Sequence, residues 1–201
     1  MTAGGYVGGI LAEIPNNSAC NVLIESCFNT GTLTATNQTE DQHIGGIVGM
    51  GFDRILNCYH AGTLEAGSTT GRSYRGGILG YVAKGTGAAT LAHNYSVQSA
   101  SLSVGGHAED AVLADDTTLM LASSMQEESF IDTLNRYEKP VSLYQVTFAM
   151  DSKAENDGYP VIGKLKKIKN YNAAITAFSL NGRLGVIDQE AGTITVMLPY
   201  N

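Results

Sequence analysis

One pattern of glycine and aromatic residues occurs three times in the first half of the chain. Each copy begins with an aromatic residue or His, a spacer residue and Gly-Gly-Ile, and the paired glycines are Gly8-Gly9, Gly45-Gly46 and Gly76-Gly77. Gly8 to Gly45 spans 37 residues and Gly45 to Gly76 spans 31. A period of this length is typical of stacked repeats, in which one unit buries its apolar face only against its neighbours.

A second segment, Ile-x-x-Cys-aromatic-x-x-Gly-Thr-Leu, follows in the first two copies and is looser in the third. It contains the pairs Cys27-Phe28, Cys58-Tyr59 and Asn94-Tyr95. Because successive side chains of a strand point to opposite faces, each ring is expected opposite the residue before it. If the cysteines point inward, the three rings form an outward-facing ladder. Such a ladder either binds a sugar or a protein, or packs against a loop or a neighbouring copy.

Short apolar strands bounded by glycines and turn residues predict an all-β fold. We expect residues 1–110 to form a β-solenoid, with the copies as its coils. Paired glycines in strands indicate close backbone approach or tight corners. Besides the paired glycines and the two cysteines, the structural positions of the repeat are Gly49, Asn57, Gly62, Gly80 and Asn94.

The second copy, from His43 to Leu64, resembles the GLUG-motif repeats of bacterial cell-surface and secreted proteins nearly position by position. The usual form of that motif is Tyr-Val-Gly-Gly-Ile-Val-Gly, a gap, and Ile-x-Asn-Cys-Tyr-x-x-Gly-x-Ile. The first copy departs from it with Ala12 in place of the closing glycine and Ser26 in place of the asparagine. The resemblance implies an extracellular or cell-surface location. Such repeats occur in adhesins and in surface peptidases whose catalytic domains lie elsewhere.

Residues 111–169 are predicted to cap the solenoid, since an uncovered end is an open sheet edge. They contain one predicted helix, at about 124–136, with Ser124 at its N-cap and Glu127 completing a capping box. The segments at 130–135 and 156–161 resemble elements that follow the last coil in GLUG proteins.

Residues 170–201 resemble the opening strands of Ig-like modules of surface proteins, with Asn181-Gly182 as a turn signal. Those modules are typically about 100 residues long, so this segment is expected to be an incomplete one. Its exposed strands predict a dimer formed by pairing between two chains.

The charge balance narrows the class of partner. The formal net charge is -7 and the pI is about 5.0, which argues against nucleic acid because phosphate binding needs clustered Lys and Arg. The chain opens almost directly on a repeat, so we expect the natural protein to extend further upstream. Attachment to a membrane or cell wall is then expected only through regions outside these 201 residues.

No catalytic or metal-binding pattern stands out, and no cofactor is expected. The three cysteines lack zinc-ligand spacing and are interpreted as small buried residues, with a disulfide or reactive thiol as the alternative. The four histidines, His43, His60, His93 and His107, lack a His-Glu-x-x-His pattern. An EF-hand frame over residues 153–164 would begin on Lys153, where a carboxylate is required, although a weaker calcium site from loop carboxylates remains open.

These observations predict a non-catalytic extracellular module, an adhesive or spacer stalk whose partner is a host or cell-surface protein or a glycan. The speculative binding residues are Phe28, Tyr59 and Tyr95. One alternative is an accessory, substrate-positioning region of a larger surface peptidase or carbohydrate-active enzyme. A polysaccharide-cleaving β-helix is disfavoured because Glu25 and Asp53 are isolated carboxylates in the strands, and glycosidases use a pair.

Overall fold

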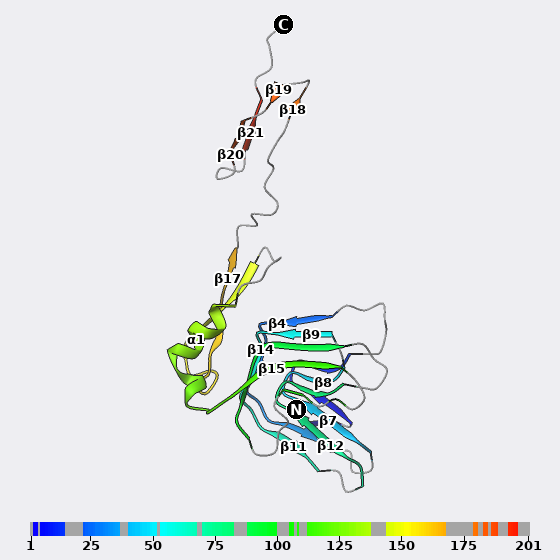
Figure 1. The fold of residues 1–201 in the computed structure, drawn as a ribbon. Coiled ribbons are helices and arrows are strands. Elements are labelled where there is room, and N and C mark those ends of the chain that lie inside the picture. The colour runs from blue at the N-terminus through cyan, green and yellow to red at the C-terminus, as the bar shows by residue number, and fades with distance from the viewer. Residues whose placement is uncertain are drawn as a thin grey trace. The chain divides into compact units, whose positions relative to one another are not determined.

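The computed structural model in Figure 1 is built mostly of short β-strands, with one α-helix among the described residues. It describes residues 2–3, 5–14, 22–36, 40–51, 53–67, 70–82, 88–99, 105–106, 108, 112–137, 144–167, 179–180, 183–184, 186–188 and 193–196. The chain divides into two compact units. The first is Met1–Tyr137 with Val146–Lys164, and the second is Glu138–Gln145 with Leu165–Asn201.

Each copy of the repeat supplies one short strand at each of several equivalent places. The first copy contains β2 (Tyr6–Gly8), β3 (Leu11–Glu13), β4 (Leu23–Glu25), β5 (Phe28–Asn29) and β6 (Leu33–Ala35). The second contains β7 (Gln42–Gly45), β8 (Val48–Met50), β9 (Asp53–Leu56), β10 (Tyr59–His60) and β11 (Leu64–Ala66). The third contains β12 (Ser73–Gly76), β13 (Leu79–Tyr81) and β14 (Ala89–Val97), and β1 (Thr2–Ala3) precedes the first.

Equivalent strands of successive copies pair in parallel. Their orders are β1-β6-β11, β12-β7-β2, β13-β8-β3 and β4-β9-β14-β10-β5, with β15 (Leu113–Met120) pairing with β14. Figure 1 shows β4, β9, β14 and β15 side by side in that order. The prediction of an all-β fold is confirmed. Because β15 extends the sheet, paired strands continue beyond the boundary predicted at residue 110.

The glycines of the motif are explained by contacts between backbones. A Cβ atom on Gly45 would lie 1.7 Å from the Val48 carbonyl oxygen of the same copy. A Cβ atom on Gly46 would lie 2.2 Å from the Gly77 carbonyl oxygen of the next copy. Real Cβ atoms do not approach backbone this closely, so any larger residue would force these layers apart. A Cβ atom is similarly blocked at Gly8, Gly9, Gly49, Gly62, Gly76 and Gly80.

The main apolar core lies inside the repeat array. Branched aliphatic side chains from all three copies form it, together with the buried Cys58. Cys27 packs against this core and is only partly buried, and both cysteines are free thiols. The third cysteine, Cys20, lies outside the described residues. The prediction that Cys58 behaves as a small buried residue is confirmed.

A bend at one position of every copy explains the residue types found there. Ser26, Asn57 and His93 have φ of 52°, 52° and 54°, in the left-handed region. Asn and His are enriched among the non-glycine residues that adopt this conformation. The strand register pairs Tyr59 with Tyr95. Asn94 therefore lies opposite Cys58 and not opposite Asn57.

The predicted helix is shorter than expected. A 3-10 turn, η1 (Ser124–Gln126), precedes α1 (Glu128–Asn135). The predicted capping box is wrong, because Ser124 lies inside η1 while Glu127 is the N-cap residue of α1 and makes no side-chain capping bond. The helix is instead held by packing, since Phe130, Ile131 and Leu134 are buried in an aromatic cluster.

The remaining strands form two-stranded sheets. One consists of β16 (Tyr144–Ala149) and β17 (Val161–Lys167). Antiparallel pairs are formed by β18 (Ser179–Leu180) with β19 (Arg183–Leu184), and by β20 (Val186–Asp188) with β21 (Thr193–Thr195). The predicted turn residues Asn181 and Gly182 fall between β18 and β19 but lie outside the described residues.

Candidate binding site

The predicted ladder of rings exists, but it is covered. Phe28, Tyr59 and Tyr95 pair in register, and the rings of Phe28 and Tyr59 stack with centroids 5.2 Å apart. They lie on the face opposite Cys58, as strand alternation predicts. Phe130 of α1 covers them, with its ring edge-on to Tyr59 at 5.6 Å, and Tyr59 is 0% exposed. Of the two alternatives for the ladder, packing against another segment therefore holds for Tyr59, because α1 packs on it.

The Tyr59 hydroxyl fastens the loop between β16 and β17 to the repeats. It donates a hydrogen bond to the Pro160 carbonyl and accepts one from the Asn156 amide at 3.2 Å. Asn156 also accepts a hydrogen bond from the Thr30 hydroxyl. Burial raises the pKa of the Tyr59 hydroxyl above its ordinary value. Tyr59 is thus part of the fold's interior, whereas Phe28 and Tyr95 are half-buried.

A second row of rings comes from the residue that opens each copy. Tyr6, His43 and Tyr74 pair in register on β2, β7 and β12. The rings of Tyr6 and His43 stack with centroids 5.2 Å apart and 8° between their planes. Tyr81 of β13 joins the row, 4.6 Å from His43 and 4.7 Å from Tyr74. We call these four residues the ring row.

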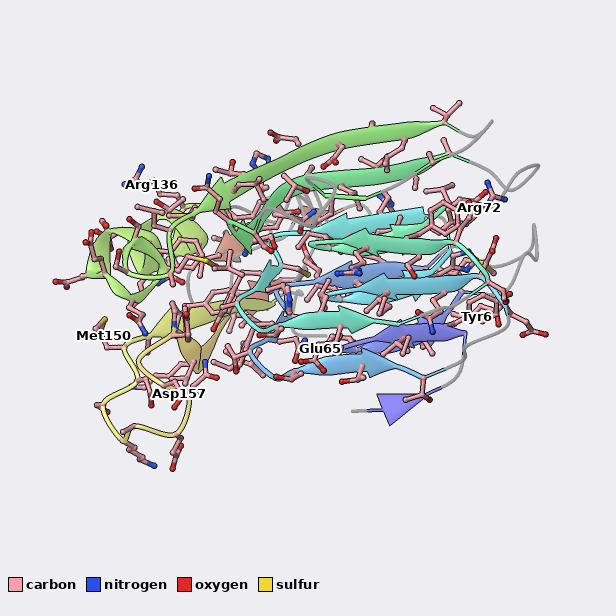
Figure 2. The ribbon with its side chains drawn as sticks, turned by 90° about the horizontal axis from the view of Figure 1, so that it is seen from below. Tyr6, Glu65, Arg72, Arg136, Met150 and Asp157 are labelled. Carbon is pink, nitrogen blue, oxygen red and sulfur yellow. The ribbon has the colours of Figure 1, made fainter. Side chains whose placement is uncertain are left out.

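The ring row ends in an accessible aromatic face. His43 and Tyr74 are buried, whereas Tyr6 is 40% exposed. One face of the Tyr6 ring lies on His43, and no other described ring contacts it. Figure 2 shows Tyr6 and Arg72 at one end of the strands and Arg136 at the other. A flat apolar surface is therefore open at the first-copy end of the row, and it lies at the end of the strands away from Arg136.

A charged pair lies beside the ring row. The Arg72 guanidinium is 3.4 Å from the Asp41 carboxylate and 5.4 Å from the centre of the Tyr74 ring. The Asp41 carboxylate also accepts a hydrogen bond from the Arg72 backbone N–H at 2.7 Å. Both side chains are exposed. The ring that the guanidinium contacts is the buried Tyr74, whereas the exposed Tyr6 lies at the opposite end of the ring row.

The other histidines do not share one site. His60 is buried, and that burial lowers its pKa to about 4, so the ring is neutral at pH 7. Its Nδ1 atom is 3.1 Å from the Asn29 carbonyl oxygen. His93 is exposed at the bend of the third copy, and His107 lies outside the described residues. Within the described part of the chain, no three His, Cys, Asp or Glu side chains are grouped as metal ligands.

The central carboxylate of the acidic loop after β16 is hydrogen-bonded to the backbone of the loop itself. Asp151 accepts backbone N–H bonds from Glu155, Asn156 and Gly158 at 2.8 to 3.1 Å. Partial desolvation acts to raise the pKa of this carboxyl, but these donors outweigh it and lower the pKa. Both oxygens are thus engaged by the loop's own backbone, which favours the turn over the calcium site that the sequence left open.

Comparison with known proteins adds no family assignment: no family model matches the chain, and neither do any curated proteins or solved structures. None of the helices in the described ranges is both long and apolar enough to span a bilayer.

Of the candidate binding residues taken from the sequence, Tyr59 is fully buried. The signal for the ring row was present, because an aromatic residue or His opens every copy. Only the register and the position of the cap distinguish the open row from the covered one.

Proposed function

We propose that this chain is a non-catalytic, extracellular glycan-binding module of a bacterial surface protein. Its three copies are proposed to be coils of a GLUG-type β-solenoid. The repeat motif and the parallel pairing of equivalent strands support this fold. The proposal moves the binding site from Phe28, Tyr59 and Tyr95 to the ring row.

One observation carries the proposal: Tyr6 is 40% exposed, and no described ring covers the face of its ring away from His43. The apolar face of a sugar ring can lie on an aromatic face, where its slightly positive C–H groups meet the negative face of the ring. The Arg72 guanidinium donates and the Asp41 carboxylate accepts hydrogen bonds, so the pair suits hydroxyls of a longer glycan that extends from Tyr6 along the same end of the strands. Removal of the ring should therefore weaken binding more than removal of the charge.

The test is a glycan array followed by calorimetry on any hit, with Tyr6→Ala, Arg72→Gln and Leu121→Ala. Leu121 is an exposed apolar residue outside the ring row and serves as the matched control. We expect Tyr6→Ala to weaken binding about tenfold or more and Leu121→Ala to leave it unchanged. Equal binding by all variants contradicts this site. Binding to matrix proteins but to no glycan would instead indicate a protein partner, and no binding at all would leave the role of a spacer stalk.

A further inference from the structure

Cys27 and Cys58 are neighbours across two successive copies. Each cysteine directly precedes a ring of the ladder, and the pairing of Phe28 with Tyr59 in register places the two cysteines side by side. Paired strands of a sheet lie about 4.8 Å apart. This separation falls within the range of about 4.4 to 6.8 Å that is found between the Cα atoms of bridged cysteines. The strand register therefore permits a disulfide between the first two copies.

The two side chains lie against the same short stretch of backbone. The Cys58 sulfur accepts a hydrogen bond from the Cys27 backbone N–H at 3.4 Å, so it reaches back toward the first copy. It is 3.9 Å from the Ile24 carbonyl oxygen, and the Cys27 sulfur is 3.4 Å from the next carbonyl oxygen along the chain, that of Glu25. A bond between the sulfurs thus needs a change in side-chain rotamer and not a new strand register.

The row contains one pair of adjacent thiols. In the third copy Asn94 takes the place of the cysteine, opposite Cys58. Cys58 therefore has a thiol on one side and an amide on the other. The remaining cysteine, Cys20, lies outside the described residues, so the experiments below replace it.

We propose that Cys27 and Cys58 are oxidised to a disulfide that links the first two copies covalently. The structure shows the two thiols before this oxidation. The bond would join positions 31 residues apart, next to β5 and β10, which are only two residues long each. Disulfides persist in oxidising compartments, which suits the extracellular location of the proposed function. The bond itself depends only on the register of the two copies.

The oxidant is a small-molecule disulfide such as oxidised glutathione. The Cys27 thiolate attacks one of its sulfur atoms and releases one molecule of glutathione, and the Cys58 thiolate then attacks the Cys27 sulfur and releases the second. Two electrons pass from the cysteines to glutathione, and the two protons of the protein thiols end on the glutathione thiols.

The exchange takes place while the first two copies pair, before Cys58 is enclosed. Burial raises the pKa of the Cys58 thiol, and a hydrogen bond to the Cys27 side chain raises it further. Because the thiolate is the form that reacts, Cys58 exchanges slowly once it is buried. The same burial protects the finished bond from reductants.

The first experiment refolds the full chain from urea in a mixture of reduced and oxidised glutathione and then blocks the remaining thiols with iodoacetamide under denaturing conditions. Two chains are compared. One carries Cys20→Ser and keeps the native pair. The matched control carries Cys20→Ser, Cys58→Ser and Asn94→Cys, which moves one thiol a copy further along the row. Its two thiols are about 9.6 Å apart, beyond the roughly 7 Å at which a bridge can form.

Peptide mass mapping reads the result. The first Lys or Arg of the chain is Arg54, so trypsin leaves Cys27 in residues 1–54 and Cys58 in residues 55–72. With Cys20→Ser alone, we expect these two peptides to be linked, with a mass lower by two hydrogen atoms than the sum of the reduced peptides. The control should form its link about tenfold less. Equal linking in both chains overturns the proposal, and so does alkylation of both Cys27 and Cys58 in the first chain.

The second experiment needs no refolding. The Cys20→Ser chain is produced in the oxidising periplasm of a bacterial host, and hydrogen exchange in β5 and β10 is measured with and without a phosphine reductant. Reduction should speed this exchange about threefold or more, whereas a chain that also carries Cys27→Ser should exchange alike in both conditions. Equal exchange of the Cys20→Ser chain in both conditions overturns the proposal. Neither experiment alters the ring row, so a failure here is separate from a failure to find a glycan.

Discussion

At the scale of single residues, the repeat uses different side chains for the same structural task. The Cys27 N–H donates to the Cys58 sulfur at 3.4 Å, and the Cys58 N–H donates to the Asn94 side-chain oxygen at 2.9 Å. Asn94 also donates to the Ile55 carbonyl of the preceding copy at 2.7 Å, and the Cys58 thiol donates to the equivalent Ile24 carbonyl at 3.9 Å. Cysteine and asparagine are therefore interchangeable here because each combines an acceptor with a donor.

Replacing Asn94 should be costly. Asn94→Ala leaves the Cys58 N–H and the Ile55 carbonyl buried without these partners, and we expect a loss of about 2 to 4 kcal/mol in the free energy of unfolding. Asn94→Cys restores the side chain found in the other copies and should lose clearly less. Urea denaturation measures both, and equal losses would contradict the shared role.

His60 should make stability depend on pH. Its pKa in the folded state, about 4, lies below the ordinary value of 6.5, so the unfolded chain binds a proton first as the pH falls. This contribution to stability is complete above about pH 6.5, is lost progressively down to about pH 4, and amounts to about 3 kcal/mol.

His60→Asn removes this titration while keeping a polar residue, since Asn29 holds the paired position in the first copy. The difference in unfolding free energy between the unmodified protein and His60→Asn is measured from pH 7.5 to 4. The carboxylates titrate alike in both proteins, so this difference contains only the contribution of the histidine. A difference that does not change with pH would contradict the assignment.

At the scale of elements, the cap determines which aromatic residues meet solvent. Phe130 contacts both Tyr59 and Tyr95 edge-on, at 5.6 and 5.2 Å. Asn135 fastens the other end of the helix by bonds to the backbone N–H and carbonyl of Phe148, at 2.8 and 3.0 Å. The helix is held to the repeats by Phe130 and to β16 by Asn135 rather than by its own propensity, since eight residues are too few for a stable isolated helix.

Removing the Phe130 ring should weaken the packing of α1 on the repeats. Phe130→Ala is expected to cost about 3 to 5 kcal/mol and to increase hydrogen exchange in α1 and β10. Asp132→Ala, an exposed position on the same helix, is the matched control and should change stability by less than about 0.5 kcal/mol. Similar losses in both variants would mean that the helix does not depend on this packing.

At the scale of the whole molecule, the repeat array accounts for most of the described strands, and the short strands near the C-terminus pair only two by two. Within the described ranges these pairs have no third strand at either outer edge, and an unpaired strand edge is a site at which chains associate. Val186 in β20 is 74% exposed, so an apolar side chain accompanies one of these edges.

The predicted dimer through these strands can be tested directly. Val186→Lys places a charge on the edge strand and should convert a dimer into a monomer, as measured by light scattering over a range of concentrations. Leu121→Ala, on the first unit, should leave the association unchanged. A monomer before any substitution would contradict the predicted dimer.

The sequence alone determined the repeated strands and the positions that only glycine can occupy. Its glycine pairs and apolar runs predict parallel, equivalent strands because period and composition are local properties. It also placed Phe28, Tyr59 and Tyr95 correctly on the face opposite the cysteines.

The tertiary structure alone decided which rings are open. Burial of Tyr59 depends on Phe130, which lies far along the chain and reaches it only through the path of β15 and η1. The exposure of Tyr6 depends equally on what lies next to the first copy. Burial is a property of neighbours in space, and a pattern with a short period carries no information about a cap that occurs once.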